Sequence, residues 1–126
     1  MKKTVVALFL LLVTSVPARG DQASFLATKA KAEAGDPKAQ NKLGTYYQLG
    51  LNTEQSDAEA VRWFRKAAEQ GNGDGEFNLG EMYEKGRGVP VDREQALYWY
   101  KKACDSACKC GCKSWRKLKS QQPLLK

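Results

Sequence analysis

The sequence repeats itself at an interval of 36 residues, and this repeat limits the fold more than any other feature. Residues 32–67 align with residues 68–103 without a gap. Eleven aligned pairs are identical: Ala32/Ala68, Glu33/Glu69, Gly35/Gly71, Leu43/Leu79, Gly44/Gly80, Tyr47/Tyr83, Gly50/Gly86, Ala60/Ala96, Trp63/Trp99, Lys66/Lys102 and Ala67/Ala103. Repeats of about 20–50 residues are typical of solenoids and arrays, in which each unit buries its apolar face against a neighbour.

Each repeat has the start and stop signals of two helices. In the first repeat, Asp36 is a good N-cap, Pro37 suits the first helical position, and Gly50 can end the helix. A second helix is expected from Ser56, which forms a capping box with Glu59. Apolar residues follow both helices at intervals of three and four, which predicts one buried face on each. The second repeat carries the same signals, with a capping box of Asp92 and Gln95.

Small and aromatic residues at the repeated positions predict close packing of these helices. A glycine inside a helix costs about 1 kcal/mol relative to alanine, so Gly44 and Gly80 indicate that another backbone passes close by. Trp63 and Trp99 are expected to fill the space where helices diverge. The structural positions of the two repeats are Leu43, Gly44, Tyr47, Gly50, Ala60, Trp63, Leu79, Gly80, Tyr83, Gly86, Ala96 and Trp99.

These motifs closely resemble the Sel-one-like repeat, a relative of the tetratricopeptide repeat. The resemblance implies an all-α fold, a short α-solenoid of about five helices, and a general role in binding other proteins. The first repeat departs from the family pattern because it has Asn52 and Thr53 in place of the second loop glycine and the valine. We expect a less regular loop there. The second repeat matches at Leu79-Gly80, Tyr83, Gly86, Gly88-Val89, Asp92, Ala96, Trp99-Tyr100 and Lys102-Ala103.

The amino-terminal residues have the pattern of a secretory signal peptide. Lys2 and Lys3 precede an apolar run at residues 5–13, and small residues lead to a cleavage point before Asp21. The run is too short to span a bilayer, and an uncleaved anchor is the alternative. We expect export to the periplasm or outside a bacterial cell. The segments are a signal peptide (1–20), a capping helix (21–35), repeat one (36–71), repeat two (72–103) and a cysteine-rich basic tail (104–126).

The formal net charge of +7 is concentrated at the two ends of the chain. Residues 104–126 carry six basic side chains and one acidic side chain, whereas residues 21–103 are nearly neutral. A nucleic-acid-binding domain carries basic residues on its folded body, so we expect no nucleic-acid partner. The stretch KSWRKLK at 113–119 can make weak contact with an anionic surface, but we favour a solvated, frayed terminus.

All four cysteines lie in the tail, at Cys104, Cys108, Cys110 and Cys112. In an oxidising compartment an even number predicts two disulfides, with three alternative connectivities. Such bridges would attach the last helix to the tail. A thiolate site for Zn²⁺ or Cu(I) is the alternative, because C-K-C-G-C resembles metallothionein sequences, and free or intermolecular thiols are a third interpretation. We expect no resident cofactor or metal.

Catalysis has little support in the sequence. The chain has no histidine, which removes the commonest general base and any histidine-based triad. Glu76, Glu81 and Glu84 are expected at exposed helical positions and indicate a solvated face. Some cysteine-rich members of the resembled family have been associated with β-lactam binding or hydrolysis, which we rank as the weakest alternative. We therefore expect a binding protein and no enzyme.

The expected binding surface is the concave face of the solenoid, formed by the first helix of each repeat. Most aromatic residues fit the core, but Tyr46 and Tyr98 lie at stripe edges and could face this surface as anchors. The partner is expected to be another protein. The exposed polar positions predicted to contact it are Asn41, Thr45, Gln48, Asn78, Glu81 and Lys85.

Overall fold

The computed structural model describes residues 19–121, and residues 1–18 and 122–126 lie outside the described part. The predicted signal peptide (1–20) therefore lies outside it, apart from its last two positions. The described residues are all-α, as predicted, with six helices where about five were expected. These helices are α1 (Arg19–Glu33), α2 (Pro37–Leu49), α3 (Asp57–Glu69), α4 (Gly73–Lys85), α5 (Arg93–Asp105) and α6 (Lys109–Ser120). None of them is long and apolar enough to cross a bilayer.

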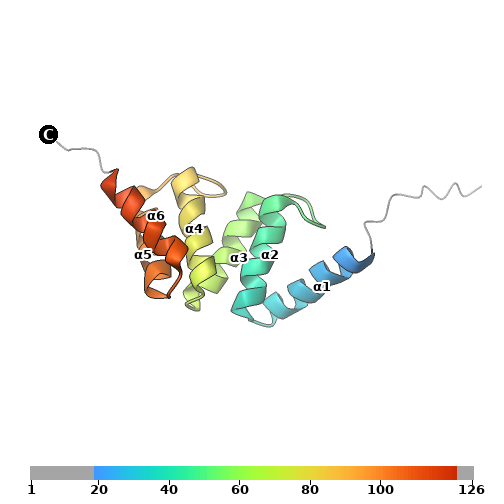
Figure 1. The fold of residues 1–126 in the computed structure, drawn as a ribbon. Helices are drawn as coiled ribbons and strands as arrows, with labels where there is room; N and C mark the ends of the chain where they lie inside the picture. The colour runs from blue at the N-terminus through green and yellow to red at the C-terminus, as the bar shows by residue number, and fades with distance from the viewer. Residues whose placement is uncertain (1–18, 122–126) are drawn as a thin grey trace, which may run out of the picture.

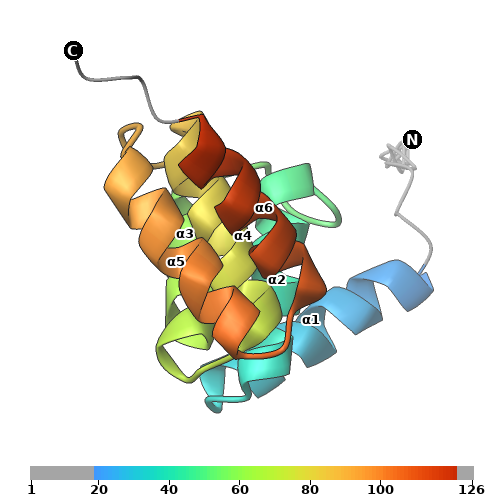
Figure 2. The same cartoon turned by 60° about the vertical axis from the view of Figure 1, so that its left-hand side comes forward.

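The helices form a stack of two rows that follows the order of the sequence (Figures 1 and 2). Helices α2, α4 and α6 form one row, while α3 and α5 form the other. Helix α4 lies against both α2 and α6, whereas no Cα atoms of α3 and α5 come within 8 Å of each other. Helices on the inner side of a curved stack lie closer together than those on the outer side. The row of α2, α4 and α6 is therefore the concave side.

The predicted N-caps are confirmed, but the two capping boxes are only half formed, because the backbone N–H groups of Ser56 and Asp92 donate to the carbonyls of Tyr47 and Tyr83 instead of to Glu59 and Gln95. The side chains of Asp36, Ser56 and Asp92 each accept a hydrogen bond from a backbone N–H in the first turn of α2, α3 and α5. Gly50 and Gly86 end α2 and α4 with φ angles of 67° and 66°. This left-handed backbone is readily accessible to glycine, and it turns the chain into the loop that leads to the next helix.

The glycines inside α2 and α4 accommodate aromatic rings, and the prediction of a close second backbone is wrong. A Cβ atom at Gly44 would lie 2.6 Å from Cδ1 of Phe64, and one at Gly80 would lie 2.7 Å from Cδ1 of Tyr100. Both rings come from the second helix of the same repeat. The glycine is needed because a flat ring, rather than a backbone, fills the space between the two helices.

Helix α6 occupies the place that the first helix of a third repeat would have. It begins at Lys109, one repeat interval after the start of α4 at Gly73. Gly75 of α4 and Gly111 of α6 also have equivalent neighbours. A Cβ at Gly75 would lie 2.7 Å from Cβ of Ala67, and one at Gly111 would lie 2.5 Å from Cβ of Ala103. The same close approach thus recurs one repeat later.

The expectation of a frayed tail is therefore wrong for residues 109–120. Leu118 is buried and Trp115 packs against the same cluster, which also contains Ala96 and Tyr100 of α5. Gly111, Trp115 and Leu118 lie on one side of α6, so the helix has an apolar stripe of its own. That stripe gives the segment a reason to dock on α5 rather than remain solvated.

The core consists of three clusters placed along the stack. Trp63 belongs to the first cluster and Trp99 to the second, so each tryptophan packs between successive helices of the solenoid. The third cluster holds α6 against α5 and α4. Each cluster joins neighbouring units only, as expected for a repeat protein. The buried members are Phe25, Ala32, Ala39, Leu43 and Trp63; then Ala60, Val61, Phe64, Ala68, Leu79, Met82 and Trp99; and then Ala96, Tyr100 and Leu118.

Candidate functional site

The concave face carries the polar residues predicted for partner contact, but most of them are less exposed than expected. Only Lys85 is exposed, and the other five are half-buried. The reason is that α2 and α4 lie side by side, so that residues along their seam cover one another. Asn41, Thr45 and Gln48 lie on α2, and Asn78, Glu81 and Lys85 lie on α4.

An amide pair joins the two repeats on this face. Asn78 Nδ2 donates a hydrogen bond to Asn41 Oδ1 at 2.8 Å. Thr45 Oγ1 donates to the main-chain oxygen of Asn41 at 3.2 Å, which ties its side chain to its own helix. Among the described residues, Asn41 Nδ2 and Asn78 Oδ1 have no other partner. The pair therefore presents one donor group and one acceptor at the seam.

Further along the seam, the contacts are weaker. Gln48 Nε2 lies 3.6 Å from Met82 Sδ, which is a weak acceptor. Lys85 Nζ lies 3.3 Å from Glu81 Oε1 in an exposed i,i+4 ion pair. Pairs of this kind contribute about 0.3–0.5 kcal/mol. Glu81 and Lys85 can therefore exchange their ion pair for contacts with a partner protein at little cost in free energy.

Helix α6 extends the same face with basic residues that the sequence reasoning did not place there. Lys117 occupies the position that Thr45 has in α2 and Glu81 has in α4, and it is exposed. The shared interval between Gly75 and Gly111 is the sequence signal that could have revealed this helix. Lys117 thus places a positive charge at a position that is neutral in α2 and acidic in α4.

Two tyrosines were expected at this surface, and Tyr98 does not lie there. It is 50% exposed on α5, which belongs to the outer row. Its ring meets the edge of Trp99 at 5.0 Å between centroids. Tyr46 is half-buried on α2, and its hydroxyl lies 3.1 Å from Ser24 Oγ of α1. That hydrogen bond lowers the pKa of the Tyr46 phenol.

The expectation that Glu76, Glu81 and Glu84 are exposed is wrong for Glu76, which is 2% exposed. Its Oε2 has no hydrogen-bond partner among the described residues. Gln40 occupies the same position one repeat earlier and donates from Nε2 to the carbonyl of Ala32 at 3.1 Å. A carboxylate cannot donate in this way. Glu76 is therefore buried like Gln40 but does not form the equivalent hydrogen bond.

Of the other two carboxylates, Glu84 is exposed and Glu81 half-buried. Glu84 accepts a hydrogen bond from the hydroxyl of Tyr100. Burial of the ring, this hydrogen bond and the charge of Glu84 all raise the pKa of the Tyr100 phenol. The pair joins α4 to α5 within one repeat, which is a structural role rather than a catalytic one.

The structure pairs Cys104 with Cys112 and Cys108 with Cys110. Their Cα atoms lie 4.4 Å and 5.3 Å apart, respectively. The first pair joins the end of α5 to the first turn of α6. The second lies in the turn that opens α6, where Cys108 is the N-cap residue. This is one of the three connectivities that the sequence left open.

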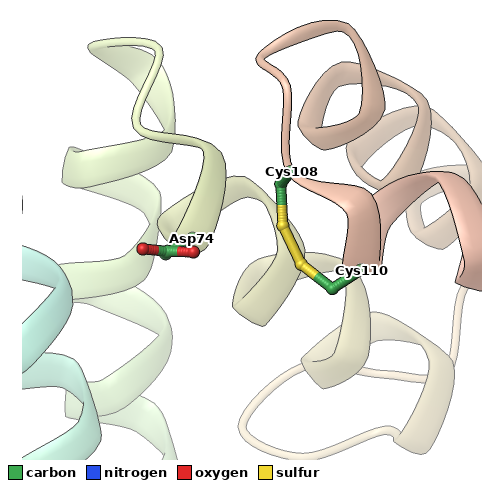
Figure 3. A group of neighbouring side chains, drawn as sticks. All are labelled: Asp74, Cys108 and Cys110. Carbon is green, nitrogen blue, oxygen red and sulfur yellow. A yellow bond between two sulfur atoms is a disulfide. The ribbon is translucent and has the colours of Figure 1, made fainter.

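Asp74 of α4 lies opposite the Cys108–Cys110 pair, as Figure 3 shows. Its carboxylate and the two sulfur atoms all lie within 4.8 Å of one another. Zn²⁺ binds cysteine as the thiolate, so the same sulfurs cannot hold a metal while they form a disulfide. Reduced, the group would supply two thiolates and a carboxylate.

Two Ser-x-x-Lys tetrads occur in the tail, at residues 106–109 and 114–117, and the sequence reasoning overlooked them. This spacing also occurs in β-lactam-reactive enzymes, where the serine is the nucleophile. Among the described residues, neither serine is hydrogen-bonded to the lysine of its tetrad. Lys109 and Lys117 are both exposed. The tetrads therefore lack the enclosed, coupled geometry that activates a serine.

Comparison with known families supports the repeat assignment. The model of the Sel1 repeat family matches residues 37–72 and 73–108. These two matches cover more than half of the 126 residues. Both matches begin with the first helix of a repeat and end just beyond its second helix. The chain also resembles a curated protein, the secretory immunoglobulin A-binding protein EsiB of Escherichia coli O6:H1. The two are 44% identical over 70 residues, which are 53% of this chain and 14% of that protein.

Solved structures of related proteins have the same fold. A Sel1 repeat protein from Oxalobacter formigenes is 36% identical with a TM-score of 0.74, over 77% of this chain and 28% of that one. A protective antigen of uropathogenic Escherichia coli with an SLR fold is 35% identical with a TM-score of 0.76, over 79% and 21%. The Helicobacter pylori cysteine rich protein B is 25% identical with a TM-score of 0.70, over 73% and 69%. The predicted α-solenoid is thus confirmed.

Proposed function

Because the chain belongs to the Sel1 repeat family, whose members act as protein-interaction scaffolds, we propose that it is an exported module that binds another protein. The binding surface is the concave face of α2, α4 and α6. Scaffolds of this family are typically not enzymes, and the proposed role needs no catalytic group. The chain spans only 14% of the immunoglobulin A-binding relative. The partner of that relative therefore serves only as the first candidate to test for binding.

The amide pair on the concave face is the observation that carries this proposal. Asn41 Nδ2 can donate to a peptide carbonyl, while Asn78 Oδ1 can accept from a peptide N–H. An extended segment lying across the seam offers both groups along its backbone. The pair would therefore hold a peptide by its main chain, and neighbouring residues would add side-chain preference.

Secretory immunoglobulin A is the first probe, because the 44% identical relative is named for binding it. Capture of partners from the extracellular fraction of the source provides a second, unbiased probe. The variant Asn41→Ala/Asn78→Ala should weaken binding of the captured partner by at least about tenfold, the loss of roughly 1.4 kcal/mol. Gln95→Ala, which removes an exposed amide from α5 in the outer row, is the matched control.

The outcomes of this experiment separate cleanly. Loss in the double variant with retention in Gln95→Ala supports the concave face. Equal binding by both variants places the contact elsewhere and overturns the assignment of this surface. Failure of both probes to yield any partner for the folded chain contradicts the scaffold role itself.

Export rests on the amino-terminal pattern of two lysines, an apolar run and small residues. Mass measurement of the protein recovered from periplasm and medium tests it directly. A chain that has lost about twenty residues supports a cleaved signal peptide. Recovery of the intact chain from the cytoplasm alone contradicts export.

The basic face of α6 supports an additional weak contact with an anionic surface. Leu118 is buried and the Trp115 ring is covered by Lys119, whose Nζ lies 4.8 Å from its centroid. The helix therefore offers charge but no free apolar stripe, so the contact should be purely electrostatic and weaken with salt. Vesicles with and without anionic phospholipid, at low and high salt, test this. Binding unaffected by either variable argues against it. The exposed basic residues of α6 are Lys109, Lys113, Arg116, Lys117 and Lys119.

A metal-binding role of the reduced cysteines is the second candidate, and the position of Asp74 near Cys108 and Cys110 favours it. Native mass spectrometry with and without reductant distinguishes it from a disulfide cap. Each disulfide lowers the mass by two hydrogens, and a bound metal adds its own mass. A stoichiometric metal on reduced thiols supports the metal role, whereas two disulfides without metal eliminate it.

A further inference from the structure

The loop that follows α4 is fastened to the start of α3 by an arginine. Arg87 Nη2 lies 2.8 Å from Asp57 Oδ1, and Arg87 Nε lies 3.2 Å from Oδ2 of the same carboxylate. Next to it, Gly88 has a φ angle of 71° and lies directly on the Asp57 backbone. A Cβ at Gly88 would stand 2.5 Å from the Asp57 carbonyl oxygen. This loop therefore closes tightly over the helix start.

The loop that follows α2 lacks both of these features. One repeat earlier, the residues at the positions of Asp57, Arg87 and Gly88 are Asp21, Leu51 and Asn52. Asn52 keeps the left-handed backbone, with a φ angle of 58°. It nevertheless carries a Cβ, which the close approach made by Gly88 would not admit. The loop after α2 therefore cannot pack on the start of α1 as closely as the loop after α4 packs on the start of α3.

A pocket of about 390 Å³ lies where the second repeat has its arginine. Among the residues with described side chains, the carboxylate of Asp21 has no ion-pair partner. The hydroxyls of Ser24 and Tyr46 lie 3.1 Å apart and bond to each other. Leu51 of the wall and the neighbouring Leu49 are exposed. The lining residues are Asp21, Ser24, Tyr46, Gly50, Leu51 and Asn52.

We propose that this pocket binds an arginine side chain of the protein partner, with its guanidinium on Asp21 in the way that Arg87 sits on Asp57. The proposal rests on the proposed scaffold function for the existence of a protein partner, but its site lies at the α1–α2 end rather than on the amide pair. In the first repeat the arginine would come from the partner protein, whereas in the second repeat Arg87 of the chain itself supplies it.

The chemistry of the pocket selects arginine over other cations. A guanidinium presents a planar fork that matches a carboxylate with two parallel hydrogen bonds, as the Arg87 pair does. Its aliphatic stem can lie along exposed leucine side chains. A metal ion would find a single carboxylate there, which is too few ligands for a divalent cation.

Titration of the isotope-labelled full chain with N-acetyl-arginine amide, followed by amide chemical shifts, tests the site. Saturable shifts are expected at Gly50, Leu51 and Asn52. N-acetyl-citrulline amide, which has a similar shape but no charge, should bind at least about tenfold more weakly. Asp21→Asn should reduce arginine binding to the same degree. Equal binding of the two probes, or full binding by Asp21→Asn, overturns the proposal.

The titration is run on the full chain and on a chain that begins at Asp21, because cleavage of the predicted signal peptide would place a new α-amino group beside this carboxylate. Probe binding by the full chain but not by the chain that begins at Asp21 overturns the proposal for the exported protein. The full chain also keeps the helix start of α1 as the structure describes it.

A transplanted arginine provides the second arm. Leu51→Arg gives the first loop the residue that the second loop has, so it should fill the pocket and remove binding of the probe. Leu51→Gln, which adds a polar group of no charge, is the matched control and should keep it. Probe binding by Leu51→Arg equal to that of the unaltered chain contradicts the proposal. If Leu51→Arg no longer binds the probe while binding of the protein partner still depends on Asn41 and Asn78, the proposed scaffold function is unaffected.

Discussion

The ring of Tyr100 lies on Gly80, so closely that a Cβ atom at this glycine would stand 2.7 Å from Cδ1 of the ring. Phe64 and Gly44 have the same relationship in the first repeat, at 2.6 Å. A glycine in the first helix and a ring in the second therefore set the distance between the two helices of each unit. This contact explains why a helix-disfavouring residue recurs at the interval of the repeat.

Substitution of Gly80 by alanine should destabilise the protein. The added methyl group meets the buried Tyr100 ring, and overpacking of this kind costs about 1–3 kcal/mol. The gain in helix propensity offsets up to about 1 kcal/mol of that cost. Urea denaturation followed by circular dichroism measures the difference.

Gly73→Ala is the control for this prediction. Gly73 lies at the start of α4, and a Cβ there would meet its nearest neighbours at an ordinary 3.4 Å. The stability of Gly73→Ala should equal or slightly exceed that of the unaltered chain. The packing account of Gly80 fails if Gly80→Ala is as stable as Gly73→Ala.

Glu76→Gln should stabilise the second repeat by about 1 kcal/mol. The buried carboxylate leaves one oxygen without a partner, and an unsatisfied buried polar atom costs about 1–3 kcal/mol. An amide at this position can donate to the carbonyl of Ala68, as Gln40 donates to Ala32. The midpoint of urea denaturation is the measurement, and Glu69→Gln on the exposed face of α3 is the control. A lower midpoint for Glu76→Gln than for Glu69→Gln would contradict this interpretation.

Stability should fall at alkaline pH because of Tyr100. Burial, the hydrogen bond to Glu84 and the charge of Glu84 raise the pKa of this phenol in the folded state. The unfolded chain loses the proton near its ordinary pKa of about 10 while the folded chain keeps it. The stabilisation is therefore fully present below about pH 10 and decreases as the pH rises above it.

Tyr100→Phe tests this pH dependence because it removes the titrating group and keeps the ring on Gly80. Urea midpoints of this variant should decline less above about pH 10 than those of the unaltered chain. Tyr98→Phe, on the exposed side of the same helix, should decline like the unaltered chain. Identical alkaline profiles for all three proteins would remove Tyr100 as the cause.

The Cys104–Cys112 pair should contribute more stability than the Cys108–Cys110 pair. Closure of a loop of this length restricts the unfolded chain by about 2–3 kcal/mol, and the shorter second loop restricts it less. Cys104→Ala/Cys112→Ala should therefore lower the unfolding free energy more than Cys108→Ala/Cys110→Ala does. Equal loss in both variants, or none in the first, would show that the tail does not depend on the bridge between α5 and α6.

Local signals predicted much of the fold but little of the candidate site. Caps at Asp36, Ser56 and Asp92 depend on neighbouring residues along the chain, so the sequence reveals them. Burial of Glu76 depends on its position beside the end of α3, and no pattern within α4 indicates it. The tail was misjudged for the same reason. Its basic composition suggested a solvated end, whereas a few apolar residues on one side were enough to dock it on α5.

By itself the sequence determined the two repeats, their helix ends and the solenoid, because a periodic chain must bury the same face in every unit. Only the tertiary structure decided which atoms fill each interface and where the repeats differ. It put rings rather than backbones against Gly44 and Gly80, added α6 to the concave row, and left a pocket beside Asp21 where the next repeat places Arg87. Such differences arise between residues far apart in the chain, where distance and shape, and not local preference, determine contact.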